Sequence, residues 1–248
     1  MGLAHRIIPL LLMNHGHLVK GKQFNSARIV GNVFQAAEIH QARGVDEMIV
    51  IDVGTTFYGH EPDVYAIRRL TEKCFMPVTA GGGVRTVDHV RELLANGADK
   101  VLIGSAAVED PSLILKCARK FGSQAIVVAV DVLAGRFITS QCGATQHMYD
   151  AVDFAKDMEL KGAGELIVTR IKREGMMLGY DTALIKEIAK AVDIPVIASG
   201  GCGEYEDMHK ALEAGASAVA AGSLFQFTDC TPKGAAEYLA GKGWEVRL

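Results

Sequence analysis

Short apolar runs alternate with longer amphipathic segments along the whole chain of 248 residues. Each run is rich in Val, Ile or Leu and ends near Gly, Ser, Thr or Asp, which is typical of strands buried on both faces of a parallel sheet. We therefore predict eight strands, at residues 6–12, 47–53, 77–80, 100–103, 125–131, 165–169, 195–198 and 218–221.

The segments between these runs repeat their apolar positions every three or four residues, as amphipathic helices do. The clearest examples are residues 87–96, 111–121, 151–161 and 181–192. Eight strand–helix units in about 250 residues fit a closed (β/α)8 barrel better than an open sheet. No linker rich in Pro, Gly or Ser divides the chain, so we predict one α/β domain, a TIM barrel over residues 1–248.

An internal repeat divides this barrel into two halves. Residues 76–83 (MPVTAGGG) resemble residues 194–201 (IPVIASGG), and residues 97–105 (GADKVLIGS) resemble residues 215–223 (GASAVAAGS). Corresponding residues lie 118 positions apart, as Gly200 does from Gly82. A constant spacing of this kind indicates a two-fold repeat of half-barrels, about residues 1–122 and 123–248.

Composition narrows the range of partners and cofactors. The net charge is −3 and the pI about 6.2, so a nucleic-acid partner has no electrostatic support. The apolar stretches fall far short of the roughly 20 residues that span a membrane, and the start of the chain does not match a signal peptide. The five cysteines form no metal-binding or disulfide pattern. We expect a reduced, cytoplasmic protein without a metal or cofactor.

A Gly-Gly pair follows the third and the seventh predicted strand, and a Gly-Ser pair follows the fourth and the eighth, all at one rim of the barrel. Glycine lets backbone N–H groups approach an anion, and a following helix start adds a favourable dipole. We predict two phosphate sites and hence a long, doubly phosphorylated ligand; the alternative is tight turns with helix caps. The first site comprises Gly82, Gly83, Gly104 and Ser105, and the second comprises Ser199, Gly200, Gly201, Gly222 and Ser223.

One carboxylate is expected at the same rim without its symmetric partner. Asp131 ends the fifth predicted strand (AIVVAVD), where it can act as a general acid or base. Aligning this strand with the first one (RIIPLLL) places Leu12 opposite Asp131. One half of the barrel therefore has a proton-transfer group, and the other half has an aliphatic side chain.

Several motifs along the chain are similar to those of a single known protein family: RIIP at 6–9, LVKG at 18–21, FGSQAIVVAVD at 121–131, GAGE at 162–165, GYD at 179–181, IPVIASGG at 194–201 and VRL at 246–248. They resemble the HisF family, the cyclase subunit of imidazole glycerol phosphate synthase, over essentially the whole chain. The resemblance implies a two-fold (β/α)8 barrel. It also implies use of ammonia from a HisH-type glutaminase, bound as a heterodimer, to form imidazole glycerol phosphate in histidine biosynthesis.

The resemblance also assigns roles to residues at the rim. The family uses two catalytic aspartates, of which the second matches Asp131 and the first falls on Leu12. Loss of one member of such a pair commonly costs about 10²–10⁴-fold in rate. Lys20 matches a family lysine in residues 14–32, which we expect to form a long loop that closes over substrate. Thr169 and Gly175 fall at substrate-binding positions, although residues 172–176 (KREGM) differ from the family's Asp-Arg-Asp-Gly-Thr.

Charged residues begin four of the predicted strands at the opposite end of the barrel: Arg6, Glu47, Lys100 and Glu165. Pointing inward, they would form a ring of alternating charge at the barrel floor, and from spacing alone a purely stabilising role is the simpler interpretation. The resemblance instead matches them to the gate through which ammonia enters, and matches Asp99 to a position that contacts the glutaminase.

The retained gate and the incomplete rim together resemble a branch of the family that has Leu-Leu in place of Leu-Asp and is associated with sugar amidation for polysaccharides. The leading prediction is a lyase-type subunit of a glutamine amidotransferase complex that transfers nitrogen to a phosphorylated or nucleotide-linked sugar, alongside a separate amidating enzyme. An authentic cyclase with Asp52 or Glu174 in place of the missing aspartate is one alternative. A non-catalytic scaffold that activates the glutaminase is another.

Overall fold

The computed structural model describes residues 4–248, except for the side chains of Ser26, Thr56 and Phe57. Eight parallel strands form a closed barrel, because the last strand pairs with the first and the fifth barrel strand pairs with the sixth. In order around the barrel they are β1 (Arg6–Asn14), β4 (Met48–Asp52), β5 (Val78–Gly81), β6 (Lys100–Ile103), β7 (Ile126–Val132), β10 (Glu165–Arg170), β11 (Val196–Ser199) and β12 (Ala218–Ala221).

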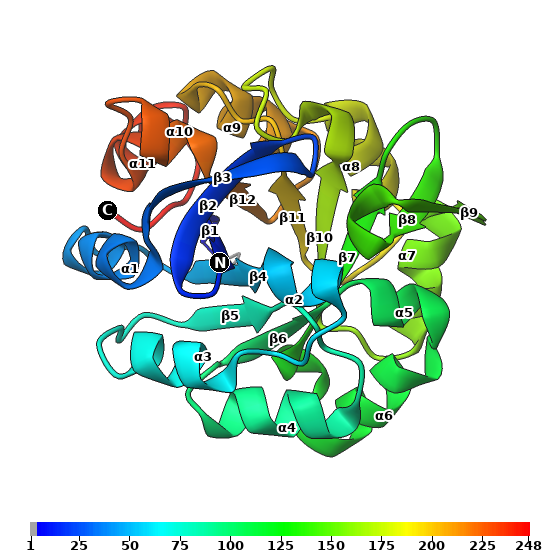
Figure 1. Ribbon diagram of the computed structural model, residues 1–248. Coiled ribbons are helices and arrows are strands. Elements are labelled where there is room, and N and C mark those ends of the chain that lie inside the picture. Colours follow the sequence, from blue (N-terminus) through cyan, green and yellow to red (C-terminus); the bar gives the residue numbers. More distant parts are fainter. Residues whose placement is uncertain (1–3) are drawn as a thin grey trace.

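This arrangement confirms the predicted TIM barrel, and the observed strand boundaries lie within two residues of the predicted ones. An outer layer of helices surrounds the strands (Figure 1). The longer ones are α1 (Val33–Ala42), α3 (Val64–Thr71), α4 (Val87–Ala95), α6 (Ser112–Phe121), α7 (Ala151–Leu160), α8 (Thr182–Ala189), α9 (Tyr205–Glu213) and α11 (Pro232–Gly241). Shorter helical segments are α2 (Val53–Tyr58), α5 (Ser105–Glu109), α10 (Ser223–Phe227), η1 (Ser123–Ala125), η2 (Gln141–Gly143) and η3 (Ile171–Arg173).

Two apolar cores follow from the alternation of side chains along each strand. The larger core lies between the strands and the helices and contains fully buried side chains such as Met48, Ile114 and Phe154. The smaller one fills the barrel interior with Ile8, Leu10, Ile49, Leu102, Val127, Ile167, Ile197, Ala218 and Ala220. The interior is therefore apolar between the two ends of the barrel. Among the described residues, no helix has the length and apolarity needed to cross a membrane.

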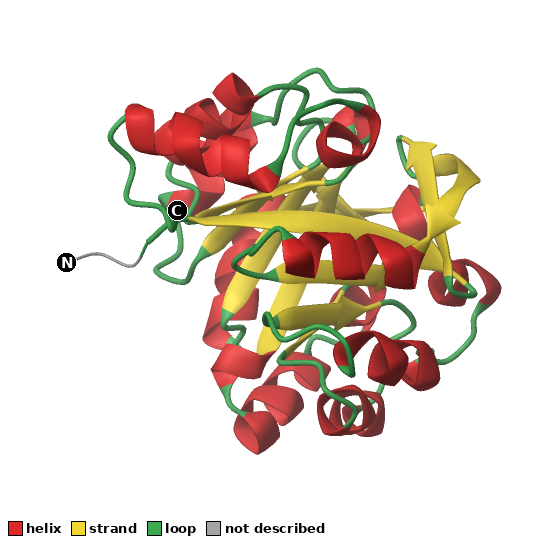
Figure 2. Cartoon of the chain, turned by 90° about the vertical axis from the view of Figure 1, so that its left-hand side faces the viewer, coloured by secondary structure: helices red, strands yellow, loops and turns green. Residues whose placement is uncertain are grey.

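The prediction of a long loop at residues 14–32 is wrong. This segment forms an antiparallel hairpin of β2 (His17–Lys22) and β3 (Asn25–Asn32), and β2 also pairs with β1. The hairpin crosses the barrel mouth in Figure 1, and in side view strands project from that end of the barrel while the C-terminus lies at the other (Figure 2). Length alone suggested a loop, but the register Leu12↔Val19 shows that the extended β1 supplies the pairing edge.

A second hairpin, of β8 (Phe137–Ser140) and β9 (Thr145–Asp150), follows β7 at the same end of the barrel. The turn between its strands contains Gln141 and Cys142, whose φ angles of 51° and 56° lie in the left-handed region. The two hairpins therefore extend the carboxyl-terminal rim after the first and fifth barrel strands, which lie opposite each other in the barrel order.

Candidate functional site

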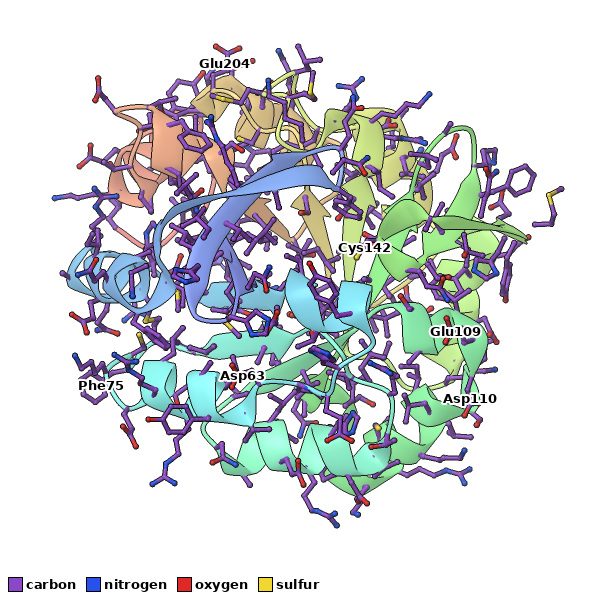
Figure 3. All side chains as sticks on the ribbon, viewed as in Figure 1. Asp63, Phe75, Glu109, Asp110, Cys142 and Glu204 are labelled. Atoms are coloured by element: carbon purple, nitrogen blue, oxygen red, sulfur yellow. The ribbon has the colours of Figure 1, made fainter. Side chains whose placement is uncertain are left out.

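A cavity of about 680 Å³ opens at the carboxyl ends of the barrel strands. Both halves of the barrel line it, and its inner wall is largely aliphatic, with Leu10, Leu12, Ile51, Leu102, Ala129, Ile167 and Ala220. Figure 3 shows Cys142 beside the ends of β7 and β10 at this mouth, and Glu109 farther out on α5. A mostly apolar pocket with a few convergent polar groups is the usual form of a small-molecule site.

Asp131 supplies a titratable group in this wall. It lies on β7 beside Thr169 of β10, in the register Asp131↔Thr169, and both residues line the cavity. Burial raises the pKa of Asp131 to about 7, and a hydrogen bond with the Thr169 side chain lowers it only in part. A carboxyl group with a pKa near neutrality can both accept and return a proton at physiological pH.

Leu12 lines the same cavity from β1, four strands away from β7 in either direction around the barrel. The two carboxylates that could replace the missing aspartate, Asp52 and Glu174, are both engaged in other contacts. Asp52 caps α2, where its Oδ1 accepts hydrogen bonds from the N–H groups of Gly54 and Thr55 at 3.0 and 3.2 Å, and it is absent from the cavity lining. Glu174 lines the cavity but forms an ion pair with Lys20.

The pair of Lys20 and Glu174 ties the β2–β3 hairpin to the loop after β10. The Lys20 Nζ lies 3.3 Å from Glu174 Oε1, and both side chains are buried. The N–H of Gln23 donates to the Glu174 carbonyl at 2.9 Å. Gly175 fits against the hairpin so closely that a Cβ there would lie 2.4 Å from the Gly21 carbonyl oxygen. The tip of the hairpin is thus docked over the mouth.

The second predicted phosphate site surrounds the same lysine. Ser199, Gly200, Gly201, Gly222 and Ser223 all line the cavity. A Cβ at Gly222 would lie 2.6 Å from Lys20 Nζ, so glycine is required for the lysine to approach. The site therefore combines a close backbone with a buried cation, both favourable for an anion.

The first predicted phosphate site also lines the cavity, through Gly82, Gly83, Gly104 and Ser105. Gly82 and Gly83 have φ angles of 105° and 69°, and a Cβ on Gly82 would lie 2.1 Å from the Asp52 carbonyl oxygen. Packing alone thus explains the first two glycines. Helices α5 and α10, which follow the two sites, have five residues each, so the expected helix-dipole contribution is small.

The four charged residues at the strand starts meet at the opposite end of the barrel. Arg6 contacts Glu47 at 2.6 Å and Glu165 at 2.8 Å, and Lys100 contacts the same two carboxylates at 3.0 and 2.9 Å. Thr79 also donates to Glu47 Oε1 at 3.0 Å. The Glu47 side chain is only 4% exposed. The residues form a closed ring in which each charge has two opposite neighbours.

Asp99 lies just outside this ring. Its carboxylate accepts a hydrogen bond from the Val78 N–H at 2.8 Å, which holds the start of β5. A surface groove beside it is lined by exposed Phe75. Asp99 therefore stabilises the start of β5 and lies next to the charged ring at the barrel floor.

Comparison with known proteins decides the family. The family described as "Histidine biosynthesis protein" matches residues 6–231. The imidazole glycerol phosphate synthase subunit HisF of Endomicrobium trichonymphae is 41% identical over 257 aligned positions, which cover 99% of this chain and 96% of the relative. The chain belongs to the HisF family. Its fold and the motifs described above agree with this assignment.

Several residues in the mouth of this HisF-family barrel were not found from the sequence. Arg85, Glu109, Gln141 and Cys142 all line the cavity. Arg85 follows the Gly82–Gly83 turn by two positions, and this Gly-Gly-x-Arg spacing was the available signal. The other three are brought in by α5 and by the unpredicted β8–β9 hairpin.

The cysteines of the HisF-family cavity are not activated. Burial raises the pKa of Cys202 to about 12, and burial and the charge of Asp131 raise the pKa of Cys142. Since the thiolate is the reactive form, neither is suited to nucleophilic attack. Over residues 4–248, no group of three or more His, Cys, Asp or Glu side chains is arranged to hold a metal ion.

Proposed function

We propose that this HisF-family chain is the synthase subunit of a glutamine-dependent complex. It receives ammonia from a HisH-type glutaminase at the barrel floor and transfers the nitrogen to a phosphorylated or nucleotide-linked sugar at the mouth. The observation that carries this proposal is the contrast between the two ends. The floor has a closed ring of four paired charges, whereas the mouth has Asp131 facing Leu12 instead of a second carboxylate.

The interior supports passage of a small neutral molecule. Between the ring and the cavity lie aliphatic side chains of the inner core, including Ile8, Val127 and Ile197. Such a wall disfavours charged or strongly hydrated species and favours neutral ammonia over ammonium. Ammonia delivered this way would reach the mouth with its lone pair free, beside Asp131.

The chemistry at the mouth then needs one proton acceptor. As the ammonia nitrogen forms a bond to an electrophilic carbon of the acceptor, it becomes positively charged and must lose a proton. The Asp131 carboxylate can take that proton and return it to the departing oxygen of the acceptor. Because burial raises its pKa to about 7, Asp131 is suited to both transfers near neutral pH.

An authentic cyclase is the second candidate function. Its support is the 41% identity to a HisF subunit over nearly the whole chain, together with Asp131 itself. Against it stand Leu12 and the engagement of Asp52 and Glu174 in other contacts. Ring closure by this candidate would need Asp131 to act without the second aspartate.

Reconstitution with a HisH-type glutaminase tests the proposal. We expect a stable heterodimer, glutamine-dependent amination of a phosphorylated sugar, and little imidazole glycerol phosphate from the phosphoribulosyl-formimino nucleotide. The Lys100→Met variant should reduce glutamine-driven amination while ammonium-driven amination continues, because only the floor is altered. Lys116→Met, which removes a lysine paired with Asp110 on the outer surface, is the control.

Three outcomes would count against the proposal. Efficient imidazole glycerol phosphate formation, lost in Asp131→Asn, would establish the cyclase instead. Stimulated glutamine hydrolysis with no aminated product, unaffected by Asp131→Asn, would indicate a scaffold for the glutaminase. Failure to bind any HisH-type glutaminase would overturn the complex itself.

A further inference from the structure

The two halves of the barrel present different side chains to the cavity. Among the described residues, the barrel strands of the first half contribute large aliphatic side chains alone: Leu10, Leu12, Ile51 and Leu102. The polar side chains that barrel strands contribute, Asp131, Thr169 and Ser199, all come from the second half. Because β1 and β7 lie opposite each other, a ligand bound at Asp131 meets an aliphatic surface on its other side.

Three of these aliphatic side chains form one continuous patch. Leu12 of β1 lies beside Ile51 of β4 in the register Leu12↔Ile51. The next strand has Gly81 at this level, and a Cβ there would lie 2.9 Å from the Leu102 Cβ, so Leu102 fills the space over Gly81. All three side chains belong to one apolar cluster. We call Leu12, Ile51 and Leu102 the aliphatic patch.

The aliphatic patch offers part of its surface to a ligand. Leu12 and Ile51 are only partly buried, and both line the cavity. Apolar surface that faces water is unfavourable, and contact with apolar ligand atoms removes that cost. A hydroxyl placed there would lose hydrogen bonds with water, and the side chains of the patch have no polar atom to replace them. The patch therefore selects apolar ligand groups over hydroxylated ones.

An anchor for the charged part of a ligand lies next to the patch. Lys20 directly follows Val19, which pairs with Leu12 in the register of β1 and β2. A Cβ at Gly222 of the second phosphate site would lie 2.6 Å from Lys20 Nζ and 2.8 Å from the Leu10 carbonyl oxygen. A ligand whose phosphate lies at Lys20 therefore needs a chain of only a few atoms to reach the aliphatic patch.

We propose that the aliphatic patch is a subsite for an apolar substituent of the acceptor, such as a methyl or short alkyl group. This rests on the proposed function, and it specifies the acceptor as a sugar derivative with an apolar group close to the carbon that receives the nitrogen. That carbon lies at Asp131, while the substituent contacts the patch. Leu12 is then a specificity-determining residue, whose side chain excludes fully hydroxylated acceptors.

Two matched phosphate monoesters, propyl phosphate and 3-hydroxypropyl phosphate, test this with the full chain and without any turnover. They differ only by a terminal hydroxyl, so a difference in affinity reports on the surroundings of that end. With ¹³C-methyl-labelled protein, we expect propyl phosphate to shift the methyl resonances of Leu12, Ile51 and Leu102. It should bind about 10-fold more tightly than 3-hydroxypropyl phosphate, because the hydroxyl finds no partner at the patch. The amides of Gly222 and Ser223 report binding of the phosphate end in both cases.

Variants of Leu12 locate the preference. Leu12→Asn supplies an amide that can form a hydrogen bond with the hydroxyl, so the preference for propyl phosphate should fall to about 2-fold or less. Leu12→Met keeps an apolar side chain of similar volume and should retain the preference. Leu160→Asn makes the same exchange at an exposed leucine that ends α7, and it should change neither affinity.

Three results would overturn the proposal: methyl resonances of the patch that do not shift, equal affinities of the two esters for the wild type, or an unchanged preference in Leu12→Asn. The measurement uses no glutaminase, glutamine or acceptor, so failure of nitrogen transfer would leave it unchanged. A responding patch in a chain that transfers no nitrogen would support the subsite and count against the proposed function alone.

Discussion

Leu12 and Asp131 line one cavity from strands that lie opposite each other in the barrel, β1 and β7. The carboxyl group of Asp131 has a pKa near 7, while the aliphatic chain of Leu12 can neither donate nor accept a proton. Of these two opposite strand ends, only that of β7 therefore carries a side chain that can transfer a proton. A reaction that needs an acid and a base on opposite faces of the substrate is at a disadvantage here, whereas a single nitrogen transfer is not.

Restoring the second carboxylate should change the reaction. We expect Leu12→Asp to raise imidazole glycerol phosphate formation from the nucleotide and ammonium salts by about 10²-fold or more, since a positioned acid–base group commonly supplies that much. Product formation can be followed by chromatography. Leu12→Asn introduces a side chain of nearly the same shape as aspartate but without a titratable group, and it should give no increase. Equal activity of the two variants would show that polarity, not proton transfer, limits the reaction.

The raised pKa of Asp131 predicts a pH dependence of stability. Between pH 4 and 7 the folded protein keeps a proton that an unfolded aspartate releases, so the free energy of unfolding falls as pH rises through this range. Above pH 7 the folded protein contains an ionised Asp131, and its stability is lowered by the full free-energy cost of burying that charge. Asp131→Asn should therefore be more stable than the wild type above pH 7, by about 1–4 kcal/mol after allowance for solvent at the mouth.

Chemical denaturation at pH 5, 6, 7 and 8 measures this difference. Asp110→Asn is a flat control, because the hydrogen bond with the Ser112 hydroxyl lowers the pKa of Asp110, so that this carboxyl is ionised in both the folded and the unfolded chain at these pH values. The stability of that variant relative to the wild type should stay constant from pH 5 to 8. A constant difference between Asp131→Asn and the wild type at all four pH values would show that burial does not hold the Asp131 proton.

The hairpin over the mouth should open when its buried ion pair is broken. Glu174→Gln leaves the Lys20 ammonium buried without a counter-charge, a change that commonly costs about 3–5 kcal/mol. We expect the cost to appear as local opening, measured as faster amide hydrogen exchange in residues 17–32. Exchange in β10 and β11 should stay slow. In the double variant Lys20→Met, Glu174→Met the hairpin should be protected again, because no uncompensated charge remains.

The periodic parts of the fold could be predicted from the sequence, and the contacts between distant segments could not. The β7 and β11 strands could be predicted from the sequence because each contains an unbroken run of aliphatic residues. The β2–β3 hairpin contains Gly21 and Lys20, and its pairing depends on the extended edge of β1. Lys20 and Glu174 are 154 positions apart, and nothing in either neighbourhood indicates that they meet.

The candidate site shows the same division. Asp131 and the glycine turns were found because they end buried strands, where side chains must reach the rim. Arg85 was missed because a single arginine in a loop belongs to no repeating sequence pattern. Only the structure shows that the His60 carbonyl accepts a hydrogen bond from its side chain and holds it in place. The ring at the floor was found as four strand starts, but only the structure shows that Glu47 also binds Thr79.

Glu47 should be the most sensitive residue of that ring. It accepts hydrogen bonds from Arg6, Lys100 and Thr79, and its side chain is almost fully buried. Glu47→Gln would leave both cations dependent on Glu165 alone, so we expect a loss of about 3–5 kcal/mol in the free energy of unfolding. Glu72→Gln breaks an exposed pair with Arg68 and should cost less than about 1 kcal/mol. Urea denaturation of the two variants compares them directly. A similar small loss in both would mean that water screens the charges of the floor ring and that its ion pairs contribute little to stability.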